Sequence, residues 1–182
     1  MTQLSDLPVI RTSIHELLER ERGIRLDIGG GRTPQPGFVN IDIRDLPEVD
    51  IVHDVESIPW PLPDNCVLVA VASHLVEHIS PAHFGFVHFM NEVWRVLKPG
   101  GEFAISCPHG SSQGFLQDPT HVNPCNETTW AYFDPEEPRT NGLLYKIYSP
   151  KPWKIKYLTW SPAANIEVVL VKREENYDHS VR

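Results

Sequence analysis

Short apolar segments alternate with glycine- and proline-rich stretches along this chain. Segments of this length and apolar content, bounded by turn residues, predict strands rather than helices. The predicted strands are Leu26–Ile28, Phe38–Ile43, Asp50–Asp54, Val67–Ala72 and Glu102–Cys107. Val67–Ala72 is apolar at every position, which is typical of a strand buried on both faces of a sheet. Lys154–Trp160 and Ile166–Lys172 flank a turn-like segment and predict a closing antiparallel hairpin.

Helical periodicity is restricted to two segments. Residues 12–22 carry a capping box of Ser13 and Glu16, which predicts the first helix. Ser80 caps the second predicted helix, and Pro81 occupies its first position. Its apolar side consists of Val87, Met90, Trp94 and Leu97, and Lys98–Gly101 ends it.

The first three predicted strands lack room for ordinary crossovers. Parallel neighbours normally need a connection of about a dozen residues, usually helical. Residues 32–37 contain two prolines, and residues 44–49 are equally short, so two helices are missing from this part of the chain. The expected fold class is α/β: a Rossmann-like, doubly wound, mainly parallel sheet, closed by an antiparallel hairpin, with reduced helices between strands 1, 2 and 3.

The length of 182 residues favours a single domain, 1–182. We expect a core at 12–107, a cap on the substrate side at 108–150 and the closing hairpin at 151–174, because 108–150 is too long for a passive loop. Three cysteines without a CxxC spacing suggest neither disulfides nor zinc. No stretch resembles a leader or membrane span, so a cytoplasmic location without membrane contact is expected.

The most informative loop is Gly29-Gly30-Gly31, which follows the apolar end of a strand and the acidic residue Asp27. Glycine has no Cβ, so a ligand can lie directly against this backbone. Loops at the carboxyl edge of parallel sheets are where α/β folds bind nucleotide-like ligands. A nicotinamide-dependent oxidoreductase is disfavoured, because the third glycine and the helix of the dinucleotide motif are both absent.

Several segments together resemble the class I S-adenosylmethionine-dependent methyltransferases, most closely small members with a Pro-Gly loop between the first two strands. The segments are Leu26-Asp27-Ile28-Gly29-Gly30-Gly31, Asn40-Ile41-Asp42, Asp54 with Ile58–Asn65, Ser73–His78 and Glu92–Gly101. They cover residues 25 to 107 in the expected order. Beyond them, Asp118-Pro119-Thr120-His121 is a looser match.

This resemblance implies S-adenosyl-L-methionine as cofactor, with S-adenosyl-L-homocysteine as product, and assigns binding residues. The glycine-loop amides of Gly29, Gly30 and Gly31, with Asp27, hold the amino-acid tail. By analogy, Asp42 binds the ribose diol. Asp54 faces the adenine amino group and Val55 packs on the ring. Ser73 and His74 form the far wall, and Arg32 is hypothesised to pair with the cofactor carboxylate in place of the missing helix N-terminus.

The histidines suggest a base or a metal site. His121 is the leading candidate for a general base, with His78 and His109 as its rivals. His74, Glu77, His78, His83, His109 and His121 also contain metal-ligating atoms, but no HExxH motif or third-ligand spacing is present. We therefore expect structural or surface histidines and no metal.

The expected function is transfer of a methyl group to an oxygen or nitrogen of a small-molecule or glycan acceptor. The net charge of −8 argues against a nucleic-acid partner, which needs a basic face. The alternative is a degenerate, non-catalytic partner subunit that binds the cofactor. The oligomeric state is left open.

Overall fold

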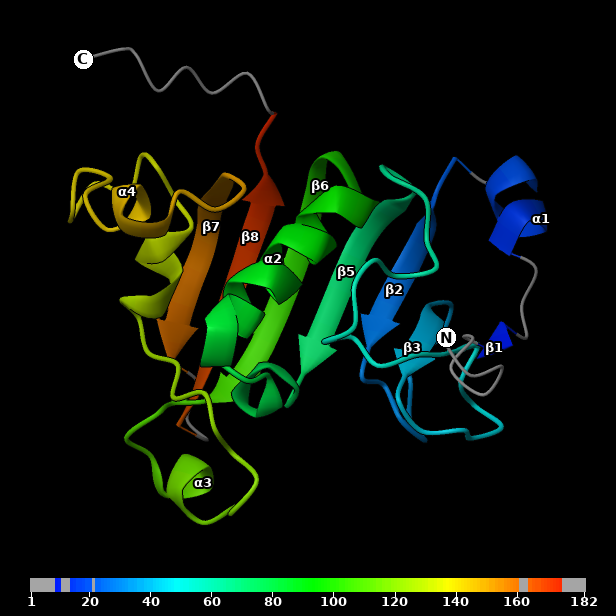
Figure 1. Cartoon of the computed structure of the whole chain (residues 1–182), viewed down its shortest axis with the longest axis horizontal. Helices are drawn as coiled ribbons and strands as arrows, with labels where there is room; N and C mark the ends of the chain where they lie inside the picture. The colour runs from blue at the N-terminus through cyan, green and yellow to red at the C-terminus, as the bar shows by residue number, and fades with distance from the viewer. Residues whose placement is uncertain (1–8, 11–13, 21, 161–163, 175–182) are drawn as a thin grey trace.

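The computed structural model describes residues 9–10, 14–20, 22–160 and 164–174. Within these ranges, an eight-stranded sheet has the order β1-β4-β3-β2-β5-β6-β8-β7 (Figure 1). The strands are β1 (Val9–Ile10), β2 (Ile24–Ile28), β3 (Val39–Asp42), β4 (Ile51–Val52), β5 (Val67–Ser73), β6 (Leu97–Pro108), β7 (Trp153–Trp160) and β8 (Asn165–Lys172). The mainly parallel sheet predicted from the sequence is confirmed.

Five strands, from β4 through β3, β2 and β5 to β6, are mutually parallel. Strands β7 and β8 form the predicted antiparallel hairpin, and β8 pairs antiparallel with β6. The two-residue strand β1 adds an antiparallel edge to β4, and it was not predicted because two residues carry no periodicity. The carboxyl ends of β2, β3 and β5 therefore meet at one edge of the sheet, the lower edge in Figure 1.

The connection from β2 to β3 contains no helix, as predicted. Instead, residues 29–38 lie across the two strands that they join. The Gln35 N–H donates to Asp27 Oδ2 at 2.7 Å, and Asn40 Nδ2 donates to the Gly31 carbonyl at 3.0 Å. A Cβ at Gly30 would lie 2.7 Å from Asn40 Oδ1, so only glycine allows this approach.

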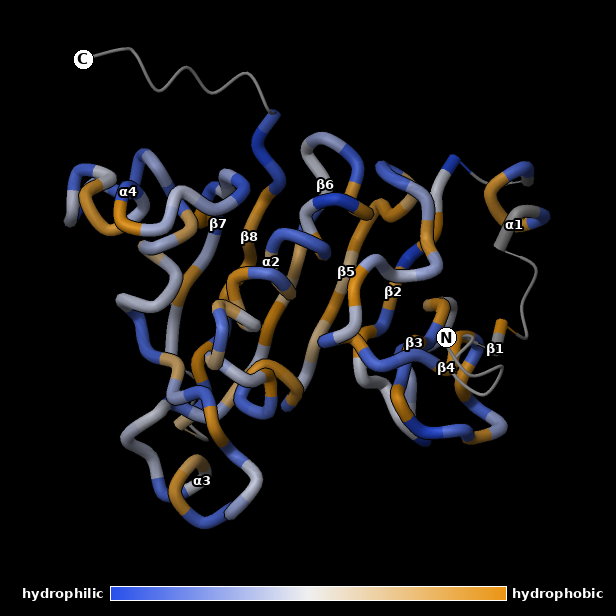
Figure 2. The backbone as a smooth tube through the Cα atoms, in the orientation of Figure 1, coloured by the Kyte–Doolittle hydropathy of each residue, from blue (hydrophilic) through white to orange (hydrophobic). Residues whose placement is uncertain are grey.

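Within the described residues, a long helix covers only one face of the sheet. Helix α2 (Gly85–Val96) crosses the central strands in Figure 1, and its buried residues include Phe89, Met90 and Val93. Burial alternates along β5, β6 and β8, so every second side chain is more accessible. The prediction that Val67–Ala72 is buried on both faces is wrong, because the missing crossover helices leave the second face open. Figure 2 shows the apolar colouring concentrated along these strands.

Helix α2 begins later than predicted. Pro81 precedes the short 3-10 helix η3 (Ala82–Phe84), in which His83 and Phe84 have φ of 51° and 62°. These left-handed residues interrupt the helix, so the regular α-helix starts at Gly85. Ser80 Oγ does accept a hydrogen bond, from the Ala82 N–H at 3.2 Å.

The remaining helices are short. Helix α1 (Ile14–Arg20) packs Leu17 and Leu18 against the core, whereas Ser13 of the predicted capping box lies outside the described residues. Segment 108–150 contains α3 (Gln113–Leu116), η4 (Thr129–Tyr132) and α4 (Tyr145–Tyr148), with 3-10 helix η2 (Val76–His78) preceding it in the chain. In Figure 1, α3 lies at the lower edge, whereas α4 lies at the opposite end. In the described part of the chain, the helices are too short or too polar to span a bilayer.

The one-sided sheet predicts different costs for the same substitution at two adjacent positions. Val168 is 1% exposed and belongs to the buried side of β8, whereas Val169 is half-buried on the other side of the strand. Val168→Ala should lower the free energy of unfolding by about 2–3 kcal/mol, because it removes two buried methyl groups and leaves a cavity. Val169→Ala should cost less than about 1 kcal/mol. Urea denaturation of both variants measures the difference, and equal costs would mean that the second face is covered.

Candidate cofactor site at the carboxyl edge of the sheet

The glycine loop bends sharply as it leaves β2. Gly29 and Gly31 have φ of 77° and 56°, which glycine adopts without the strain of other residues. The Gly29 N–H donates to the Ile41 carbonyl at 2.8 Å, so the loop is held against β3. A Cβ at Gly29 would lie 3.0 Å from Leu75 Cδ1, so the loop also approaches the segment that follows β5.

Asp42, the last residue of β3, is 5% exposed and hydrogen-bonded through both carboxylate oxygens. Arg44 Nε donates to Oδ1 at 3.0 Å and Arg44 Nη2 donates to Oδ2 at 3.1 Å. The Gly31 N–H also donates to Oδ2, at 3.1 Å. Burial alone raises the pKa of the Asp42 carboxyl, but the Arg44 contacts outweigh it and hold that pKa below its usual value.

A small, mostly apolar cavity of about 150 Å³ lies directly beside Asp42. Gly29 forms part of its wall, and Asp54 lies on the same wall as the buried side chain of Val55. The segment after β5 supplies the rest of the lining. In full, the lining is Gly29, Ile41, Asp42, Ile43, Asp54, Val55, Glu56, Leu75, His78 and Ile79.

A larger cavity of about 780 Å³ lies on the helix-free face of the sheet. The residues of this cavity that the sequence singled out are Asp27, Gly29, Gly30, Gly31, Arg32 and Ser73. Burial raises the pKa of the Asp27 carboxyl, and the nearby Asp42 charge adds to this rise, against the lowering by the Gln35 N–H. Gly29 borders both cavities, so it marks where they approach each other.

The predicted binding residues therefore line two cavities that approach each other at Gly29. Asp42, Asp54 and Val55 line the small cavity. The other members line the large cavity: Asp27, Gly30, Gly31, Arg32 and Ser73. His74 lines neither cavity: its Nε2 lies 3.2 Å from Asn165 Nδ2, and its Nδ1 lies 3.2 Å from Glu77 Oε1. Sequence reasoning did not identify Arg44 or Leu75. Arg44 could have been found as the basic residue two positions after Asp42, but Leu75 carries no chemical signal.

The three candidate bases lie in different surroundings. His121 and His78 are neighbours, with ring centroids 4.7 Å apart. His109 is stacked on Trp160, with ring centroids 3.9 Å apart, and its Nε2 lies 3.4 Å from Glu127 Oε2. Since His78 lines the small cavity, the pair of His78 and His121 is the one that adjoins the candidate cofactor site.

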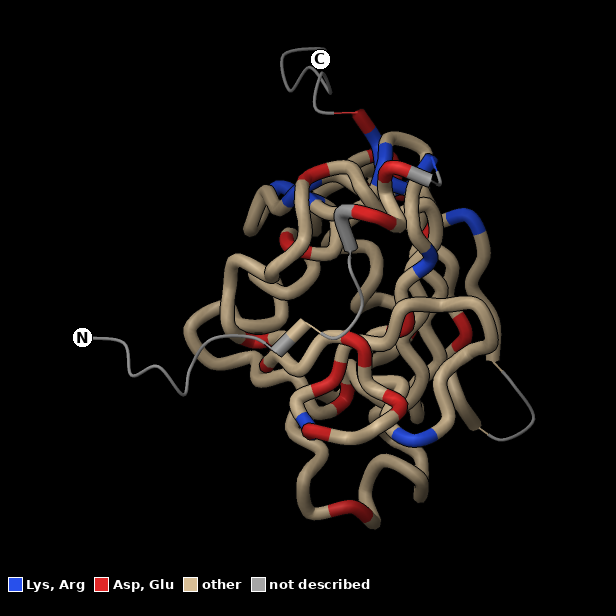
Figure 3. Tube along the Cα trace, turned by 90° about the vertical axis from the view of Figure 1, so that its right-hand side faces the viewer, with Lys and Arg blue, Asp and Glu red and all other residues tan. Residues whose placement is uncertain are grey.

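Acidic residues gather on the loops at this edge. Figure 3 shows acidic residues at both the lower and the upper end of the molecule, whereas basic residues lie mostly at the upper end. Asp42 ends β3, Asp45 lies on the loop after β3, and Asp54 and Glu56 lie on the loop after β4. A ligand with hydroxyl, amino or cationic groups suits these carboxylates better than one with several phosphates.

Comparison with known proteins identifies the fold. Residues 31–105 match the family model described as the methyltransferase domain. This match covers less than half of the chain and supports a class I S-adenosylmethionine-dependent methyltransferase domain. It is 40% identical over 63 residues to a probable S-adenosylmethionine-dependent methyltransferase of Mycolicibacterium smegmatis, a match that covers 35% of this chain and 23% of the relative.

Two solved structures share the architecture. A methyltransferase of Archaeoglobus fulgidus has a TM-score of 0.56 and 17% identity, with 90% of this chain and 96% of the other covered. The 16S rRNA (adenine(1408)-N(1))-methyltransferase of Catenulisporales acidiphilia, solved with its cosubstrate, has a TM-score of 0.59 and 12% identity, with 93% and 94% covered. At these identities the comparisons show the fold alone.

The residues of the carboxyl edge fit the family's cofactor, S-adenosylmethionine. This molecule carries a diol, an aromatic base and a charged tail. The edge offers an apolar cavity beside β4, the Asp42 carboxylate on β3 and the glycine loop after β2, in that order along the sheet. The fit has one obstacle, since Arg44 already occupies both oxygens of Asp42.

The ion pair of Asp42 and Arg44 predicts a pH-dependent effect. A carboxyl with a lowered folded-state pKa adds stability above its ordinary value near 3.8, and that stability is lost as the pH falls through the lower value. Arg44→Gln should therefore cost less than about 1 kcal/mol at neutral pH, because Arg44 is exposed, and progressively less as the pH falls below the ordinary value of the carboxyl. NMR titration of the Asp42 carboxyl carbon should show its pKa rising in the variant; an unchanged pKa would exclude the pairing in solution.

Proposed function

We propose that this chain binds S-adenosylmethionine along the carboxyl edge of its sheet and transfers the methyl group to an oxygen or nitrogen acceptor. The observation that supports this most is the small cavity, which has Asp42 and Asp54 in its lining and Gly29 as a wall. One carboxylate can bind the ribose hydroxyls and the other the adenine amino group, and the apolar side chains between them can pack on the adenine ring.

Asp42 is proposed to bind the ribose. A carboxylate accepts two hydrogen bonds from neighbouring hydroxyls, and Asp42 is held rigid by the Gly31 N–H. Arg44 must leave at least one oxygen for the diol to bind. Its side chain is 58% exposed, so water can solvate the released guanidinium at little cost.

Asp54 and its neighbours are proposed to bind the adenine. The Asp54 carboxylate accepts from an exocyclic amino group, and Val55 and Leu75 present apolar surface from the two sides of the cavity. The cavity of about 150 Å³ is below the several hundred Å³ usual for ligands of this size. We therefore expect the exposed segment around Ile43 and Arg44 to move when the cofactor binds.

The amino-acid tail is proposed to extend past Gly29 toward the larger cavity. Asp27 faces the cationic amino group there, and Arg32 and the glycine-loop amides face the carboxylate. Ser73 borders the same cavity from β5. His74 is assigned no contact with the cofactor, because it lines neither cavity and its ring is turned toward Glu77 and Asn165.

When bound, the cofactor supplies an activated methyl group on a cationic sulfur. The chain positions the reactants. The rigid strand ends fix the ribose and base, so that the acceptor approaches in line with the bond between the methyl carbon and sulfur. The acceptor forms a bond to the methyl carbon, and the electron pair of the broken bond stays on sulfur. His78 and His121 border this side of the site, whereas His109 is held by Trp160 and Glu127.

A small molecule or glycan is the proposed acceptor class. The acidic loops at this edge repel a phosphate backbone, which binds through Lys and Arg. The ribosomal RNA acceptor of one solved neighbour is therefore not carried over to this chain. A hydroxyl acceptor also suits the carboxylates and imidazoles that surround the entrance.

One observation favours a second candidate function. The bidentate contact of Arg44 with Asp42 closes the ribose position. A non-catalytic partner subunit could keep this fold with the ribose position closed, because it transfers no methyl group. In that case the chain binds the cofactor or its product weakly and transfers no methyl group.

Calorimetric titration with S-adenosylhomocysteine tests the proposal. The parent should bind with a micromolar dissociation constant, and Asp42→Asn should weaken binding at least tenfold, about 1.4 kcal/mol, since one oxygen acceptor is lost. Glu48→Gln, an exposed carboxyl on the next loop, is the matched control and should bind as the parent does. Equal binding by Asp42→Asn would contradict the ribose assignment, and parent binding without turnover over a panel of acceptors would favour the partner subunit.

A further inference from the structure

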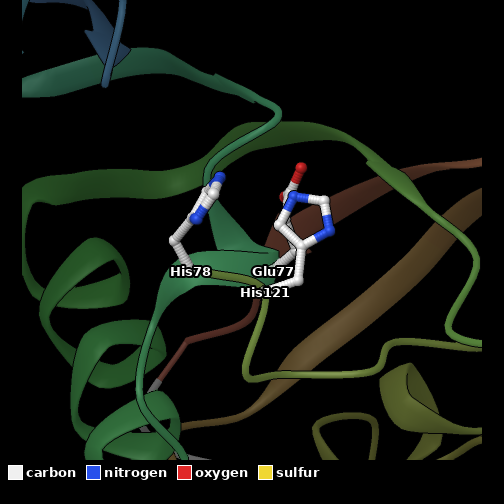
Figure 4. Close-up of side chains that lie close together, drawn as sticks. All are labelled: Glu77, His78 and His121. Atoms are coloured by element: carbon white, nitrogen blue, oxygen red, sulfur yellow. The ribbon is translucent and has the colours of Figure 1, made fainter. Parts of the chain in front are cut away.

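Glu77, His78 and His121 bring three metal-ligating groups together from two distant segments of the chain. One ligand atom from each residue lies within 4.8 Å of the other two. Glu77 and His78 belong to η2, which follows β5, and His121 follows α3. Figure 4 shows the three side chains converging at this point.

Glu77 is the unusual member of this cluster. Its side chain is fully buried, and neither carboxylate oxygen accepts a hydrogen bond among the described residues. The ring of His74 lies 3.2 Å from Oε1, but it is more than half exposed, and the contact is a charge pair only when that ring is protonated. A buried carboxylate without hydrogen-bond donors is costly unless a cation lies against it.

Both histidines already direct one ring nitrogen away from the cluster as a donor. His121 Nδ1 lies 2.9 Å from the Phe115 carbonyl, which can only accept, so Nδ1 carries the hydrogen. His78 Nδ1 lies 3.2 Å from Thr120 Oγ1, and that hydroxyl donates its own hydrogen to Asp118 Oδ1 at 2.6 Å. His78 Nδ1 is therefore also a donor, and in both rings Nε2 keeps its lone pair.

We propose that Glu77, His78 and His121 form a binding site for a divalent transition-metal ion. Two imidazole nitrogens and one carboxylate are ligands that Zn²⁺ and similar ions prefer, whereas Mg²⁺ prefers an all-oxygen set. Metal-binding histidines usually donate their other N–H to a carbonyl or an oxygen network, and both rings do so here.

The cluster is close to, but not yet at, binding distances. Ligand atoms on one tetrahedral ion lie about 3.4 Å apart, so the three groups must close by roughly an ångström from their present separation. His78 is half-buried and can supply this movement. The Asp118 carboxylate, 3.8 Å from His121 Nε2, adds negative charge to the same site.

The position of the site has a consequence for the acceptor. His78 lines both this cluster and the small cavity beside Asp42, so the ion would lie next to the proposed cofactor. Three protein ligands leave a coordination position open. The next step rests on the proposed function. An ion with an open coordination position favours a hydroxyl acceptor, because the hydroxyl binds the ion through oxygen and then loses its proton to solvent more easily.

The expectation from the sequence was different, because it treated these histidines as structural. His121 lies 43 positions after His78, and no local spacing links them. The segment that bears His121 is brought to η2 by backbone contacts. The Val122 and Asn123 N–H groups both donate to the Glu77 carbonyl, at 2.9 and 3.0 Å.

Titration of the chelator-treated full chain with Zn²⁺ alone tests the site. One ion should bind per chain, and Co²⁺ in its place should give the visible absorption bands of a low-coordinate site. Glu77→Gln and His121→Ala should each weaken Zn²⁺ binding at least tenfold. His83→Ala, an exposed histidine on η3, is the matched control and should bind as the parent does.

Thermal melting separates ligand loss from misfolding. Zn²⁺ should raise the Tm of the parent and of His83→Ala but not of Glu77→Gln, and His78→Ala serves as a second variant if Glu77→Gln does not fold. No stoichiometric binding to the parent, or unchanged binding by the ligand variants, would overturn the proposal and leave a protonated histidine as the partner of Glu77. S-adenosylhomocysteine binding should survive in Glu77→Gln, so failure of the cofactor proposal is seen separately.

Discussion

The short connections between β2, β3 and β4 are the constraint on which the rest of the structure depends. They are too short for helices, so the second face of the sheet stays open and the core forms between one face and α2. The same short connections cause the glycine loop to lie on Asp27 and Asn40. Backbone contacts in this loop thus replace part of the packing that a crossover helix supplies elsewhere in the fold.

This constraint also shapes the carboxyl edge. A helix after the glycine loop would present N-terminal amides to an anionic ligand group. Here positive charge at the edge comes from arginine side chains, with Arg44 on Asp42 and Arg32 beside the larger cavity. Side chains move more readily than a helix, so the site is closed by an ion pair that the ligand must exchange. The edge therefore combines a rigid set of strand ends with a movable cation.

The proposed acceptor side depends on a different element, the chain from α3 to Asn123. Its backbone is tied to the Glu77 carbonyl, and its His121 side chain meets His78. The later part of the same long segment packs elsewhere: Trp130 and Phe133 join the core beside Phe86. A single segment thus contacts the proposed site at one end and completes the core at the other.

Much of this architecture could be predicted from sequence, for physical reasons. Apolar segments bounded by glycine and proline identified the parallel strands, and two prolines in residues 32–37 excluded a crossover helix. The pairing of Arg44 with Asp42 was not predicted, although the two residues are only two positions apart, because spacing alone does not fix the direction of a long side chain. The meeting of His121 with Glu77 likewise depends on the path of an irregular segment, which no periodicity records.

A crystal structure with bound S-adenosylhomocysteine tests the central claim most directly. The account predicts the adenine between Val55 and Leu75, the ribose hydroxyls on Asp42, and the Arg44 guanidinium displaced from at least one carboxylate oxygen. Ligand bound only in the cavity on the helix-free face, with the pair of Asp42 and Arg44 intact, would contradict it.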